Sequence, residues 1–304
     1  MKTAVLATGR PGVIAFEGGY HGLSYGALSV TARADFRAPF ASVLPPQAHR
    51  IAFPRAAGHD VFERIDAIVA ESAKERPIGA LIVEPIQGRA GTVVPPLGFL
   101  AGLRAACDRN EIMLIVDEIF TGCGRTGAML ESVAQGVLPD LVCLGKALGG
   151  GFPVSVCLGR PEVMAAWGES TGEALHTSTF LGHPVASAAA LENLALIDDE
   201  GLLSAAAHKG ARLSAALRTA LSGADGVVEV RGRGLMWGIE LTERAGRSAG
   251  DRAWQAVLAA LGKGVLLLPA GERGEVIQLT PPATITEAQL DLLASVTIES
   301  VRAS

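Results

Sequence analysis

The sequence has little charge, and lysine is scarce in it. Only 19% of the 304 residues are charged, whereas 49% are hydrophobic, so the chain can bury a large core and is not of the disordered class. The formal net charge of −5 excludes a protein that binds nucleic acid through a strongly basic surface. Five lysines stand among the 26 basic residues. A lysine in an unusual position is therefore a candidate for a special role.

Several sequence patterns are also missing. Cys107, Cys123, Cys143 and Cys157 form no C-x-x-C pair, and we interpret them as buried free thiols of a reducing, cytoplasmic compartment. No apolar run is long enough to span a bilayer, so we expect no membrane association. No G-x-G-x-x-G stands between a predicted strand and a predicted helix, which disfavours a nicotinamide-dependent dehydrogenase.

Short hydrophobic runs alternate with helical patterns over the first two thirds of the chain. The runs that predict strands buried on both faces are residues 12–16, 80–84, 112–117 and 141–144. Residues 61–73 and 99–110 have apolar residues at helical spacing. This alternation predicts an α/β fold with a mostly parallel sheet flanked by helices.

The pattern changes beyond residue 184. The predicted helices are residues 185–196, 202–221 and 251–261 and a last one from residue 287, and the predicted strands are residues 227–230, 235–241, 265–268 and 276–279. Strands followed by a terminal helix indicate a smaller α+β domain. We therefore expect a large domain over residues 1–199 and a small C-terminal domain over residues 200–304.

Polar side chains follow the predicted parallel strands at the points where these strands end. Tyr20 and His21 follow the first strand, Glu84 the second, Asp117 the third and Lys146 the fourth. Taken singly, each has an ordinary explanation, since a carboxylate can cap the next helix and a lysine can extend to solvent. Taken together they point to a site, because ligands of open α/β sheets bind at the carboxyl ends of the strands.

The chemistry of two of these residues narrows the kind of site. Lys146 lies between a buried strand and three glycines, where removal from bulk water favours a neutral amine that can form a Schiff base. Asp117 ends an apolar strand and needs a cationic partner, which a protonated pyridine nitrogen would provide. The glycine-rich turns offer backbone N–H groups to a phosphate. The combination indicates a pocket for pyridoxal 5′-phosphate (PLP).

At these residues the chain resembles the class III PLP-dependent aminotransferases of fold type I. The segments that carry the resemblance are FEGGYHG (16–22), VEPIQG (83–88), IVDEI (115–119), GRTG (124–127), PDLVCLGKALGGGFP (139–153), HTSTF (176–180), RGRGLM (231–236) and PP (281–282). They occur in order along the whole chain. The resemblance implies transamination, in which an amino group moves from an amine or amino acid to a 2-oxo acid.

The resemblance also implies roles for individual residues. Lys146 would hold PLP as a Schiff base and then act as the base that moves a proton, while Asp117 would pair with the pyridine nitrogen. Ile119 would pack on one face of the ring. Tyr20 would lie over the other face, with His21 beside it.

Two further residues complete the implied site. Glu84 would lie near the cofactor and help to hold the substrate side of the pocket. Thr179 would bind the phosphate of the PLP in the neighbouring subunit, so the resemblance implies a homodimer.

The sequence departs from the family pattern in three places. Phe120 stands where many members have a Gln that bonds the phenolic oxygen of the cofactor. Gln278 stands where many members have an Arg for the substrate carboxylate, and an amide cannot replace a bidentate Arg clamp at equal strength. We therefore expect a weaker dependence on an α-carboxylate in at least one substrate, so that amines or ω-amino acids are handled comparatively well, unless another arginine such as Arg89 or Arg125 supplies the clamp. We also expect the family's edge strand and its phosphate-binding Ser-Gly loop to be missing, because residues 1–4 resemble the end of the helix that follows that loop.

Two alternatives to transamination within this framework stay open. An aminomutase or decarboxylase of the same family would use the same Lys146 and Asp117, although the intact GRTG turn at 124–127 is more similar to the aminotransferases. A truncated and catalytically silent remnant is the second alternative. A dehydrogenase, from another class, has the least support.

Overall fold

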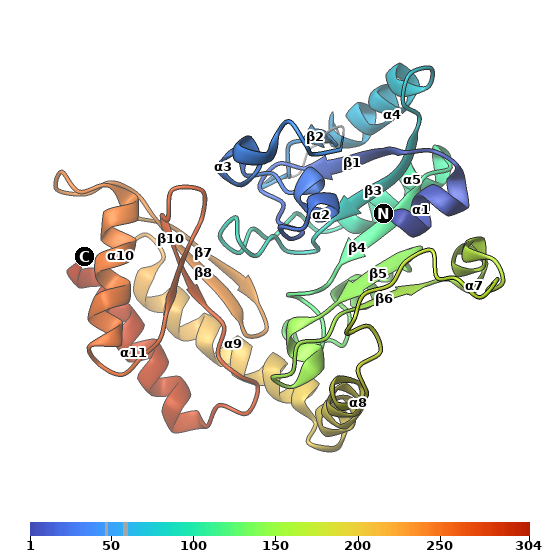
Figure 1. The fold of residues 1–304 in the computed structure, drawn as a ribbon. Coiled ribbons are helices and arrows are strands. Elements are labelled where there is room, and N and C mark those ends of the chain that lie inside the picture. The colour runs from blue at the N-terminus through green and yellow to red at the C-terminus, as the bar shows by residue number, and fades with distance from the viewer. Residues whose placement is uncertain (46–47, 57–59) are drawn as a thin grey trace. The chain divides into compact units, whose positions relative to one another are not determined.

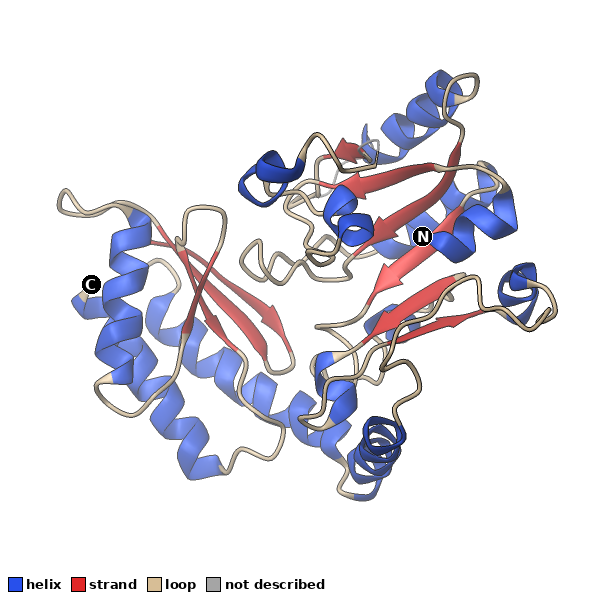
Figure 2. Cartoon of the chain, viewed as in Figure 1, coloured by secondary structure: helices blue, strands red, loops and turns tan. Residues whose placement is uncertain are grey.

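The computed structural model describes residues 1–45, 48–56 and 60–304, and in it the chain forms two compact units (Figures 1 and 2). Unit 1 comprises residues 1–85, 96–122 and 130–196, and unit 2 comprises residues 86–95, 123–129 and 197–304. Two short segments from the first half of the sequence thus pack with the C-terminal residues. The division into domains at 199/200 stays a prediction.

A six-stranded sheet forms the centre of unit 1 (Figure 1). Its strands, in spatial order, are β2 (His49–Ile51), β1 (Gly12–Phe16), β3 (Ile78–Val83), β4 (Met113–Asp117), β5 (Leu141–Leu144) and β6 (Val156–Gly159). Neighbouring strands run parallel except β5 and β6, which are antiparallel. The predicted α/β class with a mostly parallel sheet is confirmed. The sequence reading missed β2 and β6, which are short and carry few hydrophobic residues buried in the core.

Helices pack on both faces of this sheet. The helices of this part of the chain are α1 (Lys2–Thr8), α2 (Tyr25–Val30), α3 (Ala34–Arg37), α4 (Asp60–Ser72), α5 (Phe99–Arg109), α6 (Glu131–Ala134), α7 (Pro161–Met164) and α8 (Pro184–Asp199), with the 3₁₀ turns η1 (Ala38–Phe40), η2 (Lys146–Gly149) and η3 (Ala165–Trp167). Among the described residues, α3, α6 and α8 contribute none to the two cores of the sheet. Ile65 and Ile68 of α4 and Leu103 of α5 pack in a core on one face, and Ala4 of α1 and Val163 of α7 belong to the core on the other. The two cores explain why the central strands are apolar on both sides.

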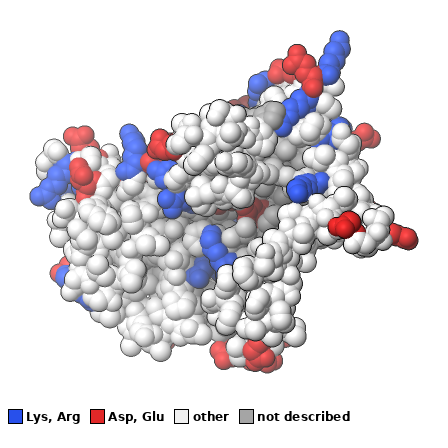
Figure 3. Space-filling view, viewed as in Figure 1, with Lys and Arg blue, Asp and Glu red and all other residues white. Residues whose placement is uncertain are grey.

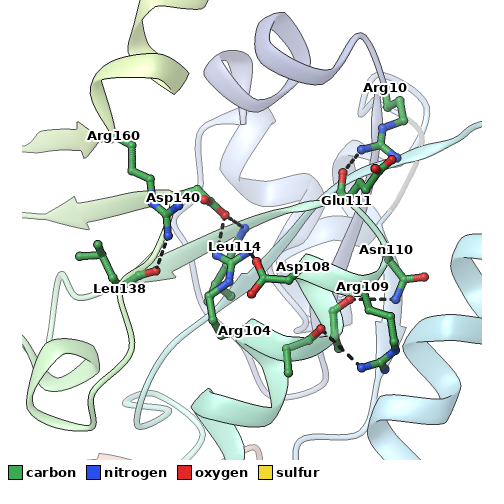
Figure 4. Close-up of polar contacts among 12 residues, drawn as sticks. Arg10, Arg104, Asp108, Arg109, Asn110, Glu111, Leu114, Leu138, Asp140 and Arg160 are labelled. Atoms are coloured by element: carbon green, nitrogen blue, oxygen red, sulfur yellow. Dashed lines mark hydrogen bonds and ion pairs between the residues drawn. The ribbon is translucent and has the colours of Figure 1, made fainter.

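Asp140 fixes the amino-terminal end of β5 (Figure 4). Its buried carboxylate accepts hydrogen bonds from the backbone N–H of Leu114 at 2.7 Å and from Nη1 of Arg104 at 2.7 Å. Arg160, beyond the end of β6, adds an ion pair at 3.5 Å. A buried charge with this many partners stabilises the join between α5, β4 and β5. It does so at the end of the sheet opposite to Lys146.

Unit 2 contains a four-stranded antiparallel sheet with helices packed on it. Its elements are α9 (Leu202–Leu221), β7 (Val227–Arg233), β8 (Met236–Leu241), α10 (Ala249–Leu261), β9 (Leu268–Ala270), β10 (Val276–Leu279) and α11 (Glu287–Ala303), with sheet order β7-β8-β10-β9. The predicted strand at 265–268 is wrong in position. Val265 and Leu267 are buried in the core, but pairing with β10 begins only at Leu268, because the chain reaches the sheet there.

The two inserted segments of unit 2 attach to this sheet by side-chain and backbone bonds. The buried Arg231 guanidinium donates to the carbonyl oxygens of Gly91, at 2.7 Å, and Thr92, at 3.0 Å. The N–H of Leu235 donates to the carbonyl oxygen of Arg125 at 2.9 Å.

Within the described residues, no helix combines the length and the apolar character needed to cross a membrane.

Candidate functional site

The predicted site residues of unit 1 follow the carboxyl ends of four parallel strands. Tyr20 and His21 follow β1, Glu84 follows β3, Asp117 ends β4 and Lys146 follows β5. Because β1, β3, β4 and β5 are neighbours and parallel, their carboxyl ends lie along the same edge of the sheet. The topology therefore brings these residues together, as the sequence analysis predicts.

Asp117 and His21 form a buried ion pair when the imidazole is protonated. Nδ1 of His21 lies 2.8 Å from Oδ2 of Asp117, and the two side chains are 3% and 6% exposed. Burial by itself lowers the pKa of His21, but the hydrogen bond to Asp117 and the charges of Asp117 and Glu84 oppose it, and on balance the pKa lies above 6.5. The second carboxylate oxygen of Asp117, Oδ1, accepts from the backbone N–H of Ile119 at 3.1 Å.

Glu84 lies beside this pair and holds the loop after β1. Its carboxylate is buried and accepts a hydrogen bond from the backbone N–H of Tyr20 at 2.9 Å. The Tyr20 ring packs edge-on against Phe36, with the ring centroids 6.0 Å apart. The negative charge of Glu84 acts on both His21 and Lys146. The structure therefore places two carboxylates, an imidazole and an amine within one electrostatic environment.

Lys146 begins the η2 turn in a strained backbone conformation. Its φ of +46° lies in the left-handed region, which side-chain-bearing residues rarely adopt. Nζ lies 4.3 Å from the centroid of the Phe120 ring. The residue is open to the surface of unit 1. Nevertheless, the protein atoms around the ammonium lower the pKa of Lys146 through desolvation, although Glu84 and Asp117 counteract this. A lysine in these surroundings releases its proton more readily than an ordinary lysine.

Two predicted residues take different positions relative to this group. Ile119 directly follows β4 and Glu118, and its side chain approaches Gly145, where an added Cβ would lie 3.6 Å from Cγ2 of Ile119. It therefore lies beside Lys146. Thr179 instead lies exposed in the segment before α8. Its role toward a neighbouring subunit stays a prediction.

The sequence analysis missed Glu118, which organises the loop next to the site. Its carboxylate is only 1% exposed. It accepts hydrogen bonds from Thr121 Oγ1 at 2.6 Å and from the backbone N–H of Glu131 at 3.0 Å. The backbone N–H and the hydroxyl of Ser132 also donate to it, at 2.7 and 2.8 Å. The sequence does show an acidic residue directly after Asp117. Its hydrogen-bond partners lie up to fourteen positions further along the chain, so no local pattern reveals that Glu118 is buried and fully bonded.

Gln278, the predicted substitute for an arginine, lies in unit 2 and is engaged there. Nε2 donates to the carbonyl oxygen of Gly88 at 3.0 Å and to Oγ1 of Thr92 at 2.9 Å. The side chain is 7% exposed. Both amide hydrogens therefore bind the 86–95 segment, and Gln278 has no donor left for a substrate carboxylate.

The residues at the sheet edge fit PLP. Nε2 of His21 is buried without a hydrogen-bond partner among the described residues, and such an orphaned atom indicates a group still to be bound nearby. Asp117 is an oriented carboxylate suited to a protonated ring nitrogen, and Lys146 is an amine suited to an aldehyde.

Comparison with known families gives the same assignment. The model of the family "Aminotransferase class-III" matches residues 1–300. The chain belongs to this family. It is 40% identical to an acetylornithine aminotransferase of Methanopyrus kandleri, with all of this chain and 71% of the relative aligned. It is 36% identical to a 5-aminovalerate aminotransferase of Pseudomonas aeruginosa, over 96% of this chain and 69% of the relative.

Solved structures of this class III aminotransferase's relatives have the same fold. An amine transaminase from an uncultivated Pseudomonas species, in a PLP-bound form, superposes with a TM-score of 0.87 at 32% identity, over 99% of this chain and 73% of that one. The ornithine aminotransferase of Toxoplasma gondii gives a TM-score of 0.86 at 30% identity, over 99% of this chain and 69% of that one. The chain is thus a PLP-dependent aminotransferase that transfers amino groups between amino donors and 2-oxo acids.

Proposed function

We propose that Lys146 binds PLP covalently through Nζ and that Asp117 pairs with the ring nitrogen. When bound, PLP supplies the electron sink that amino transfer requires. The observation that carries this proposal is the environment of Lys146, which has a strained backbone and a lowered pKa beside Glu84 and Asp117. Strain of this kind persists where the surrounding structure holds a functional geometry.

Lys146 has a second task in this proposal. Its Nζ would also be the group that takes a proton from the substrate carbon that carries the amino group. The lowered pKa leaves more of the amine neutral at neutral pH, and only the neutral amine can accept this proton. The aromatic face of Phe120 limits the motion of the end of the Lys146 side chain, since Nζ lies against it.

In this proposal, the other residues at the carboxyl ends of the parallel strands hold Asp117 and would hold the cofactor ring. His21 and the N–H of Ile119 each bond one oxygen of Asp117, which fixes the plane of the carboxylate. The fixed negative charge favours a protonated ring nitrogen. Tyr20 and Ile119 would pack on the two faces of the ring, and Glu84 positions the loop that carries Tyr20 by accepting a hydrogen bond from its backbone N–H.

Reduction with borohydride tests the assignment of Lys146. The full chain is loaded with PLP and reduced, and the labelled peptide is identified by mass spectrometry. We expect the pyridoxyl label on Lys146, its loss in Lys146→Ala and its retention in the control Lys74→Ala, an exposed lysine of unit 1. A label on Lys74 or Lys209 would refute the assignment.

We propose amines and ω-amino acids as the amino donors that this enzyme handles best. The proposal is supported by Gln278, whose amide is fully engaged with Gly88 and Thr92 and has no positive charge for an α-carboxylate. The acceptor is a 2-oxo acid. Steady-state rates for a simple amine and its α-carboxylated analogue test this. Comparable kcat/KM values are expected, whereas a strong preference for the carboxylated compound that persists in Gln278→Ala would contradict it.

We propose that the enzyme is a homodimer and that Thr179 contributes to the neighbouring subunit's site. The proposal is supported by large apolar side chains that unit 1 exposes in one stretch of the chain, namely Phe152, Leu175, Phe180, Leu181 and Leu191. Apolar groups in such number favour a protein interface over contact with water. Charged side chains form only small separate groups on the face drawn in Figure 3.

We propose the cytoplasm as the compartment of the enzyme. The proposal is supported by the four cysteines, all of which are free thiols in this structure. Reducing compartments keep thiols in this state. Immunoblots of fractionated cells test this, with the enzyme expected in the cytosolic fraction.

A further inference from the structure

Two of the cysteines face each other across the last pair of strands in unit 1. Cys143 lies in β5 and Cys157 in the antiparallel edge strand β6, and the register places them directly opposite each other. Directly opposite residues of an antiparallel pair project to the same face of the sheet. The prediction that all four cysteines are buried is wrong here, because Cys143 is half-buried and Cys157 is exposed.

The backbone hydrogen bonds show which type of cross-strand pair this is. The carbonyl oxygen of Cys143 accepts from the N–H of Glu118, at 2.9 Å, so the peptide groups of Cys143 face β4. Within a strand, the N–H and C=O of one residue point to the same side, so Cys143 makes no backbone bond to Cys157. Such non-hydrogen-bonded pairs have Cα atoms about 4.5 Å apart. That separation lies within the range of about 4.4–6.8 Å that a disulfide requires.

The two thiols are also unequal in reactivity. The interaction between their side chains lowers the pKa of Cys157 to about 6, while the pKa of Cys143 is raised. Cys107, buried in the core of the same unit, has its pKa raised to about 12 by desolvation. Since the thiolate is the nucleophile, Cys157 is the thiol that reacts first and Cys143 is placed to react second.

We propose that Cys143 and Cys157 form a reversible oxidation site that a peroxide converts to a cross-strand disulfide. The Cys157 thiolate attacks one peroxide oxygen, an S–O bond forms and the O–O bond breaks, and the departing hydroxide leaves as water after taking a proton. The Cys143 sulfur then attacks the Cys157 sulfur, the S–S bond forms and the S–O bond breaks, and a second water leaves. Two thiols and one hydrogen peroxide thus give one disulfide and two waters.

The position of this pair connects it to the catalytic segment. The disulfide would close residues 143–157 into a ring that contains Lys146 and the glycine-rich turn at 149–151. Asp117 is paired in register with Cys143 on the other side of β5. Oxidation therefore constrains the segment that carries Lys146, although the site itself is independent of the proposed role of that lysine.

Peptide mapping of the PLP-loaded full chain tests the proposal. The reduced protein is treated with hydrogen peroxide, blocked with N-ethylmaleimide and digested. We expect the oxidised chain, weighed before blocking, to be lighter by two hydrogens, and the digest to contain a linked peptide pair with Cys143 and Cys157 that dithiothreitol separates. Before oxidation, Cys157 should react with iodoacetamide about tenfold or more faster than Cys107.

Variants identify the role of each sulfur. In Cys143→Ser we expect oxidation to stop at a sulfenic acid on Cys157 that dimedone traps, and in Cys157→Ser we expect neither product. The control Cys107→Ala should form the same disulfide as the unmodified chain. A stable sulfenic acid on Cys157 in the unmodified chain, a different linkage or no reaction would overturn the proposal. If a variant does not fold, the peptide map of the unmodified chain alone decides whether Cys143 and Cys157 form the disulfide.

Discussion

At the scale of single residues, the site depends on buried charges that balance one another. Asp117 and Glu84 are buried carboxylates, and His21 is the imidazole that both of them act on. An isolated buried charge is unfavourable by several kcal/mol, so each of these groups depends on the others. The protonation state of His21 therefore reports on Asp117.

Replacing Asp117 by Asn should lower the pKa of His21. Burial is the largest influence on this pKa and acts downward, and the hydrogen bond and charge of Asp117 are the main opposing influences. NMR titration of the imidazole measures the change, and we expect a fall to below the pKa in the unmodified chain. Asp198→Asn, at an exposed carboxylate of α8, should leave the titration unchanged. An unaltered titration in Asp117→Asn would refute the pairing.

The stability that His21 provides should decline with rising pH. Its pKa in the folded state lies above 6.5, so its contribution is fully present below about pH 6.5 and is lost as pH rises through the raised pKa. Each unit of upward shift corresponds to about 1.4 kcal/mol. Urea unfolding of the unmodified chain and of His21→Gln measures this, and the difference in unfolding free energy should shrink between pH 6 and pH 9. A difference that grows with pH would contradict the sign.

At the scale of structural elements, one side chain holds the loop between β4 and α6. Glu118 receives four hydrogen bonds from Thr121, Glu131 and Ser132, which together fix both ends of that loop. The loop begins directly after Asp117. Its shape therefore determines where Ile119 and Phe120 lie relative to Lys146.

Glu118→Gln should destabilise the protein by about 3 kcal/mol, because hydrogen bonds to charged groups contribute about 1.5–3 kcal/mol each and an amide turns N–H groups toward existing donors. Denaturant unfolding measures the loss. We expect the capacity for PLP to fall as well, since the loop adjoins Asp117. Glu162→Gln, at an exposed carboxylate of α7, is the control and should change stability little. Unchanged stability in Glu118→Gln would mean that the loop is held by other contacts.

At the scale of the whole molecule, the proposed dimer makes each site depend on two chains. Lys146 belongs to the chain that binds PLP, and Thr179 is proposed to serve the site of its neighbour. In the proposed dimer these two residues would lie on different chains at every site, so their defects could be separated genetically. A monomer with both residues in one site would not allow this.

Mixing two inactive variants should restore activity. Unfolded Lys146→Ala and Thr179→Ala chains are refolded together in equal amounts. Half of the dimers are then mixed, and one of the two sites in each mixed dimer is intact, so about a quarter of the normal activity is expected. Separately refolded variants provide the control. Activity of the mixture no greater than the average of the two controls would refute the shared site, and analytical ultracentrifugation checks the dimer itself.

The sequence by itself determined the class of fold and the type of chemistry. Continuous apolar runs fixed β1 and β5 at their observed bounds, and helical spacing fixed α9, because local patterns report which residues face a core. The order of parallel strands then located Asp117 and Lys146 at one edge, since strand ends are positions in the sequence.

Only the tertiary structure decided which groups touch. The pairing of His21 with Asp117 joins residues 96 positions apart, and the locking of Gln278 onto Gly88 joins residues 190 positions apart. The same holds for the opposition of Cys143 to Cys157, which depends on the antiparallel direction of the unpredicted β6. Contacts of this kind follow from how complete elements pack, and packing is a property of the folded chain that no local pattern contains.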